Sequence, residues 1–90
     1  MEFININLDT KSSVPLYIQL YDFIKKEIQS GRLESNSKLP SKRKLSKHLE
    51  ISQNTIESAY EQLITEGYII SKPKRGYYVS ELQGVINISQ

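Results

Sequence analysis

The sequence predicts a mainly α-helical domain that ends in a small β-hairpin, and three observations lead to this fold class. Two stretches, Leu16 to Ile28 and Ile56 to Leu63, place apolar residues at helical spacing. A shorter helix is indicated between them, over about residues 41–49. Finally, Tyr68 to Lys72 and Tyr77 to Ser80 are rich in β-branched and aromatic residues, which is typical of paired strands.

The composition excludes several classes of protein. Ninety residues suffice for one small domain with a modest core. The absence of cysteine excludes disulfides and thiolate metal sites and favours a reducing cytoplasm. No apolar run exceeds three residues, so neither a transmembrane helix nor a secretory signal is predicted. We therefore expect a soluble cytoplasmic domain that has no membrane partner.

The first twelve residues are predicted to form an N-terminal arm. Ile4, Ile6 and Leu8 alternate with Asn5 and Asn7, which is a weak two-residue period. This pattern fits either a short strand or an arm that docks on the domain.

The first helix is expected to begin at Pro15, because the missing N–H of proline costs nothing in a first turn. Its apolar arc is wide, so it should pack on more than one neighbour, and Ser30-Gly31 should end it. Ile18 falls outside the arc, either as a lone exposed side chain or as part of a partner surface. The following residues, 32–38, are predicted to be a polar loop.

Two further helices should form a helix-turn-helix over about residues 41–66. Ser41 and Ser52 are favourable N-caps, Glu50-Ile51 fits a tight turn, and Gly67 should end the second of these helices. Ile56, Ala59, Tyr60 and Leu63 would form its apolar face.

The hairpin, over about residues 68–80, completes a winged helix-turn-helix. A four-residue connection, Pro73 to Gly76, joins its strands, and the glycine would supply a positive φ.

The charges are arranged in blocks, although the net charge is only +2. Residues 38–47 hold five cations and no anion, and residues 68–80 hold three cations and no anion. The segment between them, 48–67, holds four anions and no cation. A charge run is usually a solvated face, but two basic blocks that flank one short helix indicate contact with a phosphate backbone.

The residues at the start of the last helix fit the recognition of base edges in a major groove. Gln53 and Asn54 can each make a bidentate pair with adenine, while Glu57 could accept from cytosine or hold Arg43 in position. The remaining candidates would contact phosphates, bases or the minor groove. The predicted DNA-binding set is Ser41, Lys42, Arg43, Ser52, Gln53, Asn54, Thr55, Glu57, Lys72, Lys74, Arg75 and Gly76.

Catalysis finds little support. His48 is the single histidine, and its spacing from carboxylates and hydroxyls suggests no nucleophile or base arrangement. Neither a glycine-rich phosphate loop nor a metal-ligating cluster is present in the sequence, so we predict no catalytic, cofactor or metal site.

Four segments resemble the GntR-type winged helix in order and spacing: "PLYIQLYDFIKKEIQSGRL", "KLPSKRKLSKHLEIS", "NTIESAYEQLITEGYI" and "KRGYYV". Within that superfamily they are most similar to the MocR group. The resemblance implies DNA contacts at Arg43, at the start of the third helix and at the wing glycine. It covers about residues 14–80, and the DNA-binding domain is predicted over 13–80. Many relatives carry arginine where this chain has Gln53, so the operator sequence is not predictable.

The resemblance also implies a bacterial transcription regulator that binds paired half-sites as a homodimer. MocR proteins continue into an aminotransferase-like domain that binds pyridoxal phosphate, and residues 81–90 would begin the linker to it. Two other functions stay open: a winged helix that contacts a protein through Glu57 and Glu61, and an accessory domain of a working aminotransferase.

Overall fold

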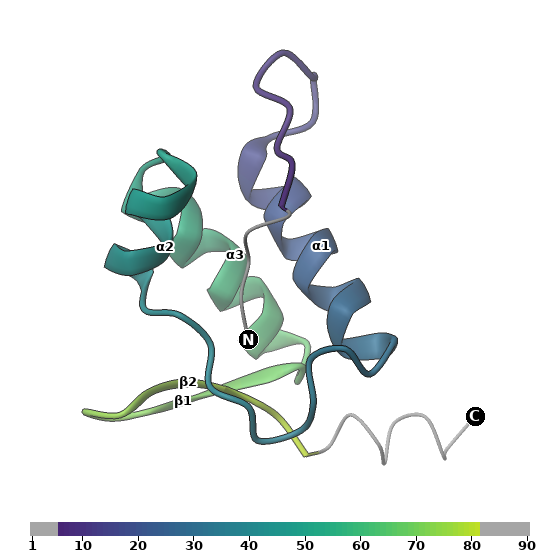
Figure 1. Ribbon diagram of the computed structural model, residues 1–90, viewed down its shortest axis with the longest axis vertical. Coiled ribbons are helices and arrows are strands. Elements are labelled where there is room, and N and C mark those ends of the chain that lie inside the picture. The colour runs from purple at the N-terminus through teal and green to yellow at the C-terminus, as the bar shows by residue number, and fades with distance from the viewer. Residues whose placement is uncertain (1–5, 82–90) are drawn as a thin grey trace.

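The computed structural model describes residues 6–81, and the elements follow the predicted order. Helix α3 lies between α1 and α2, and the hairpin crosses one end of this helical layer (Figure 1). A mainly α-helical fold with a two-stranded antiparallel wing is therefore confirmed. The elements are α1 (Leu16–Gln29), α2 (Lys42–Leu49), α3 (Gln53–Thr65), β1 (Ile69–Lys72) and β2 (Gly76–Val79).

The described part of the N-terminal arm, residues 6–12, docks on the domain and contains no strand. Ile6 and Leu8 are half-buried against the hydrophobic core. The side chain of Gln19 ties the arm to α1, since its Oε1 accepts from the N–H of Asp9 at 2.8 Å. The predicted arm residues 1–5 and the predicted linker residues 82–90 lie outside the described residues.

The core is built mainly from the facing sides of α1 and α3. Leu20, Ile24 and Ile28 of α1 are fully buried. The predicted apolar face of α3 is confirmed, because Ile56, Ala59, Tyr60 and Leu63 are all buried. Burial of one such aliphatic side chain contributes about 1.5–3 kcal/mol, so this seam holds the domain together.

Both predicted N-caps are confirmed. The Oγ atoms of Ser41 and Ser52 accept from the N–H groups of Lys44 and Thr55, at 3.1 and 3.2 Å. Between the helices, Glu50 takes the left-handed conformation at φ 59°, where glycine is more usual. This tight connection fixes the start of α3 beside α2.

The start of α1 and the segment after it differ from the predictions. Pro15 is the N-cap of α1 rather than its first helical residue. Residues 36–39 are not a free polar loop, because they pair with the outer edge of β2. The N–H of Leu39 donates to the carbonyl of Tyr77 at 2.8 Å, and the N–H of Val79 donates to Ser37 at 2.9 Å. Leu33 and Leu39 of this connection are buried in the core.

The wing turn is one residue shorter than predicted. Lys72 pairs with Gly76, so the connection contains only Pro73, Lys74 and Arg75. Lys74 takes the left-handed conformation at φ 65°, while Gly76 has φ 121° within β2. Three-residue connections are among the common hairpin loops, and here the left-handed residue is the middle one.

Tyr60 joins three parts of the fold. Tyr60 is only 1% exposed, and its ring lies in an edge-to-face arrangement with the ring of Tyr77 in β2, at a centroid distance of 4.7 Å. Its hydroxyl donates to the carbonyl of Pro40 at 2.7 Å. Burial, and then the proximity of Tyr77, raises the pKa of Tyr60 well above its ordinary value. The wing and the connection before α2 are thus held against α3 by one side chain.

Replacement of Tyr60 by phenylalanine should lower the free energy of unfolding by about 1 kcal/mol at pH 7, because one hydrogen bond is lost. Because the pKa of Tyr60 is raised in the folded state, its full stabilisation of the fold is present below about pH 10, the pKa of an unfolded tyrosine. Above that pH the stabilisation falls by about 1.4 kcal/mol per pH unit. The stability difference between wild type and Tyr60→Phe should therefore vanish at about pH 11. Urea unfolding between pH 7 and 11 measures this. Tyr17→Phe, at an exposed ring, is the control, and a pH-independent difference at Tyr60 would contradict the account.

Candidate nucleic-acid interface

The front of α3 presents two amide side chains to solvent. Gln53 and Asn54 are exposed. Ser52 and Thr55 differ from them, since their hydroxyl oxygens are hydrogen-bonded to each other at 2.9 Å while Ser52 also caps the helix. The two hydroxyls thus hold the helix start together, and the two amides are the groups most available to an outside partner.

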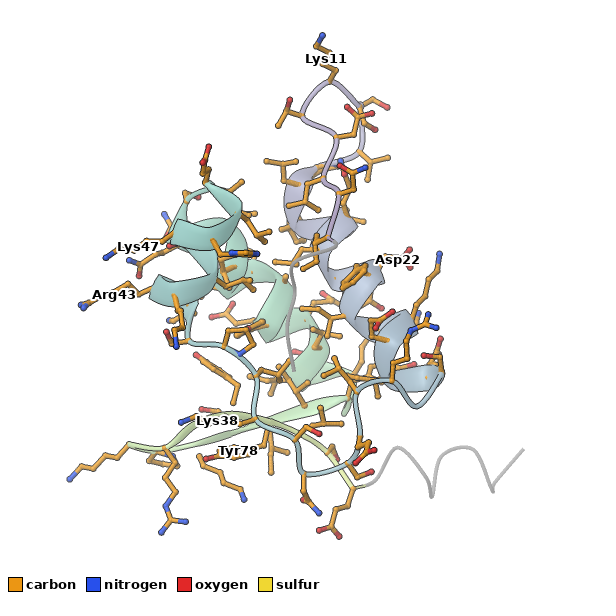
Figure 2. All side chains as sticks on the ribbon, in the orientation of Figure 1. Lys11, Asp22, Lys38, Arg43, Lys47 and Tyr78 are labelled. Atoms are coloured by element: carbon orange, nitrogen blue, oxygen red, sulfur yellow. The ribbon has the colours of Figure 1, made fainter. Side chains whose placement is uncertain are left out.

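The start of α2 lies against the same part of α3. Lys42 reaches Glu57 across the two helices, with Nζ 3.8 Å from Oε1. Sequence reasoning offered Arg43 as the partner of Glu57, but among the described residues the ion pair of Glu57 is with Lys42. Arg43 is exposed and points away from the helices (Figure 2). A partially exposed pair at this distance contributes little to stability, so Lys42 remains available to an anion.

The wing supplies a second group of cations. Lys74 and Arg75 are exposed in its turn. Lys72 is half-buried, and its ammonium lies 4.5 Å above the ring centroid of Tyr78. This cation–π contact holds Lys72 on the face of the hairpin rather than at its tip.

These cations gather on one side of the molecule. In Figure 2, Lys38, Arg43 and Lys47 point to the side toward which the turn of the hairpin projects, while Asp22 of α1 lies on the opposite side. The carboxylate of Asp22 is paired with Lys26 at 3.0 Å. The predicted basic blocks, far apart in sequence, thus face the same side of the molecule.

The structure adds two residues that sequence reasoning did not select. Tyr17 is 37% exposed and lines a hollow together with Asn54, Thr55 and Ser58. Lys38 lies beside the wing, where its backbone forms a bridge with Tyr78. In the sequence, Tyr17 falls within the apolar stretch that predicts α1, and Lys38 is one of five cations in the basic block 38–47. Neither position could be inferred without the packing of α1 and β2.

This arrangement suits an extended polyanion with readable polar edges. Exposed amides at a helix start can bond to base edges, and flanking lysines and arginines can neutralise phosphates. Within residues 6–81, His, Asp and Glu form no group arranged to hold a metal ion. No helix in that part of the chain is long and apolar enough to cross a membrane.

Residues 16–79 match the family model described as "Bacterial regulatory proteins, gntR family". The chain belongs to the GntR family. Membership makes the three helices and the wing a DNA-binding domain of the kind found in transcription regulators.

Two relatives show how this domain is used in longer proteins. The HTH-type transcriptional regulator YhdI of Bacillus subtilis is 54% identical over 76 residues, which are 84% of this chain and 16% of YhdI. The probable rhizopine catabolism regulatory protein MocR of Rhizobium meliloti is 36% identical over 75 residues, or 83% of this chain and 15% of MocR. The chain therefore spans about a sixth of the length of these curated relatives.

Solved structures share the fold. YtrA from Sulfolobus acidocaldarius, a GntR-family transcription factor, has a TM-score of 0.79 at 34% identity, covering 93% of this chain and 90% of YtrA. The DNA-binding domain of AraR in complex with operator ORE1 has a TM-score of 0.71 at 26% identity, covering 82% of this chain and 90% of that domain. A chain of this architecture thus binds operator DNA in AraR.

The cap at Ser52 yields a prediction about the integrity of the interface. Ser52→Ala should lower the free energy of unfolding by about 1 kcal/mol, because the N–H of Thr55 loses its acceptor. Ser52→Asp should keep nearly all of the stability, since aspartate is an equally good N-cap. Urea unfolding compares the two variants, with Ser58→Ala on the exposed face of α3 as control. An equal loss in both Ser52 variants would show that the cap is not the cause.

Proposed function

We propose that this chain is the sequence-specific DNA-binding domain of a MocR-like transcription regulator. The observation that supports it best is that exposed cations of α2 and of the connection before it point to the side toward which the turn of the hairpin projects (Figure 2), while the amides at the start of α3 are also exposed. Helix α3 would enter the major groove, and the wing would lie on the backbone or in the adjacent minor groove.

Base reading would fall to a small part of this surface. Gln53 and Asn54 have the donor and acceptor pair that recognises adenine, and Arg43 can bond guanine or a phosphate. Glu57 lies one turn behind Gln53, about 6 Å farther along the helix axis at 1.5 Å per residue. Held by Lys42, its carboxylate would disfavour a phosphate nearby and could accept from a cytosine amino group.

Backbone contacts would come from both sides of α3. Lys42 and the exposed positions Lys74 and Arg75 would neutralise phosphates, while Lys72 would contribute from the face of the hairpin. Ser41, Ser52 and Thr55 would act mainly by fixing the two helix starts. Gly76 would let the hairpin backbone approach closely, because it carries no side chain.

The MocR-like assignment extends the proposal to a whole protein. It is supported by the 36% identity with MocR and by the small share of that relative, 15%, that this chain covers. We propose a cytoplasmic homodimer that binds paired half-sites and continues into an aminotransferase-like domain. Any pyridoxal phosphate would be held by that further domain, which would have to supply an enclosed lysine for it. Every lysine of residues 6–81 is exposed or only half-buried, so none of them offers such an environment.

The DNA-binding function is tested with duplexes selected by the chain from a random pool. Affinity for the selected duplex should fall steeply with salt, because each phosphate contact releases counterions. If about six phosphates are contacted, the loss between about 50 and 200 mM salt should be roughly 10³-fold. Fluorescence anisotropy titrations at several salt concentrations measure it. Failure to enrich any sequence at low salt, or affinity that is independent of salt, would overturn the proposal.

Two double variants distinguish DNA binding from the alternative function, a winged helix that contacts another protein. Lys74→Gln with Arg75→Gln should weaken binding to all duplexes and flatten the salt dependence by a slope of about 1.8, or 0.9 for each contact. Glu57→Gln with Glu61→Gln should leave that slope unchanged while altering base preference. If only the glutamate double variant loses transcription regulation while it keeps its affinity for DNA, contact with a basic protein would be favoured instead.

A further inference from the structure

A pair of lysines lies between the wing and α2, and neither has so far been given a specific contact with DNA. Lys38 and Lys44 line one hollow together with Leu39, Pro40 and Ser41. Lys38 belongs to the connection before α2, and Lys44 lies in the first turn of α2. The two side chains come from segments that the fold, rather than the helix periodicity, places together.

The backbone of Lys38 is held as firmly as a strand residue. It forms an antiparallel bridge with Tyr78, and the flanking residues Ser37 and Leu39 are hydrogen-bonded to Val79 and Tyr77 at 2.9 and 2.8 Å. Two residues later, the carbonyl of Pro40 accepts from Tyr60. Lys38 therefore starts from a fixed position on the edge of β2, not from a mobile loop.

Gly76 leaves room for the stem of Lys38. A Cβ atom added to Gly76 would lie 3.3 Å from Cε of Lys38, which is tighter than ordinary contact. Gly76 also has φ 121°, a conformation that residues with a side chain rarely adopt. The glycine is thus needed both for the course of β2 and for the path of the lysine beside it.

Neither ammonium group is neutralised within the described part of the chain. The ion pairs of residues 6–81 are Lys26–Asp22, Arg32–Glu27 and Lys42–Glu57, and none includes Lys38 or Lys44. The hydroxyl of Ser41 accepts from the backbone N–H of Lys44, which leaves its own hydrogen available to donate into the same hollow. Two lysines and one hydroxyl donor that line the same hollow form a site that an external anion would satisfy.

The position of the hollow indicates which anion. Lys38 points to the same side as Arg43 and Lys47, between α2 and the hairpin (Figure 2). A duplex that receives α3 in its major groove and meets the wing must carry a strand across this gap. Lysine is a compact charge that binds phosphate without a fixed planar geometry. We propose that Lys38 and Lys44 jointly bind one backbone phosphate, with Gly76 positioning Lys38. This inference rests on the proposed DNA-binding function.

The test uses the duplex selected by the wild-type chain and a series of copies in which one phosphate at a time is a neutral methylphosphonate. Lys38→Gln and Lys44→Gln should each weaken binding about tenfold, the value of one hydrogen bond to a charged group. A methylphosphonate at one position should weaken DNA binding by the wild-type chain by a similar factor. The same substitution should not change DNA binding by the Lys38→Gln/Lys44→Gln double variant. Lys26→Gln, on the side of Asp22, is the charge-matched control and should keep wild-type affinity and the full methylphosphonate pattern.

The outcomes separate this site from the function on which it rests. If the wild-type chain binds no duplex, the DNA-binding function fails and the lysine site fails with it. If wild type binds but both single variants bind equally well at every salt concentration, only the lysine site is overturned. The site is also overturned if the double variant responds to every methylphosphonate as wild type does. Urea unfolding of each variant confirms that the exposed substitutions leave the fold intact.

Discussion

The contact of Tyr60 with Pro40 and Tyr77 sets the geometry on which the rest of the surface depends. Tyr60 projects from the buried side of α3. Its hydroxyl donates to the carbonyl of Pro40 just before α2, and its ring packs against the ring of Tyr77 in β2. One buried side chain thereby fixes the helix-turn-helix, the connection before it and the wing relative to one another. This contact also fixes which side of α3 is exposed, because α3 cannot rotate about its axis without breaking the contacts of Tyr60.

The same constraint explains how charge is distributed. The hairpin and α2 carry unpaired cations to the two sides of α3, while several anions of the domain are engaged elsewhere. Glu66 lies at the far end of α3, where Tyr21 and Gln62 donate to it and lower its pKa. Glu57 is the exception, since it lies within the cationic side and is held by Lys42. The result is a neutral, amide-bearing helix start flanked by positive charge, which suits base reading between two phosphate contacts.

The helices could be predicted from sequence because their determinants are local. Ser41 and Ser52 cap as expected, and the apolar face of α3 is buried as expected. The pairing of residues 36–39 with β2 could not be predicted, since a lone Leu39-Pro40 reads as an extended connection with no indication of its partner. The length of the wing turn could not be predicted either, because it is set by the pairing of Lys72 with Gly76 across the hairpin. Gly76 has the predicted positive φ, but the left-handed residue inside the turn itself is Lys74.

The candidate site was predicted in its residue types but not in its contacts. The blocks of charge and the amides at the start of α3 were visible in the sequence. The pairing of Glu57 with Lys42, the bond between Ser52 and Thr55 and the placement of Lys38 depend on how helices and strands meet. Contacts between side chains of different helices and strands therefore could not be predicted from the sequence.

On the proposed function, α2, the front of α3 and the wing form one DNA-binding surface. NMR titration of the 15N-labelled chain with a selected duplex tests this, because each backbone amide signal reports on its own residue. We expect the largest shift changes at Gln53 and Asn54, at Arg43 and in the wing turn, with Asp22 and Lys26 of α1 nearly unchanged. Changes concentrated around Asp22 and Lys26, with the front of α3 unaffected, would contradict it.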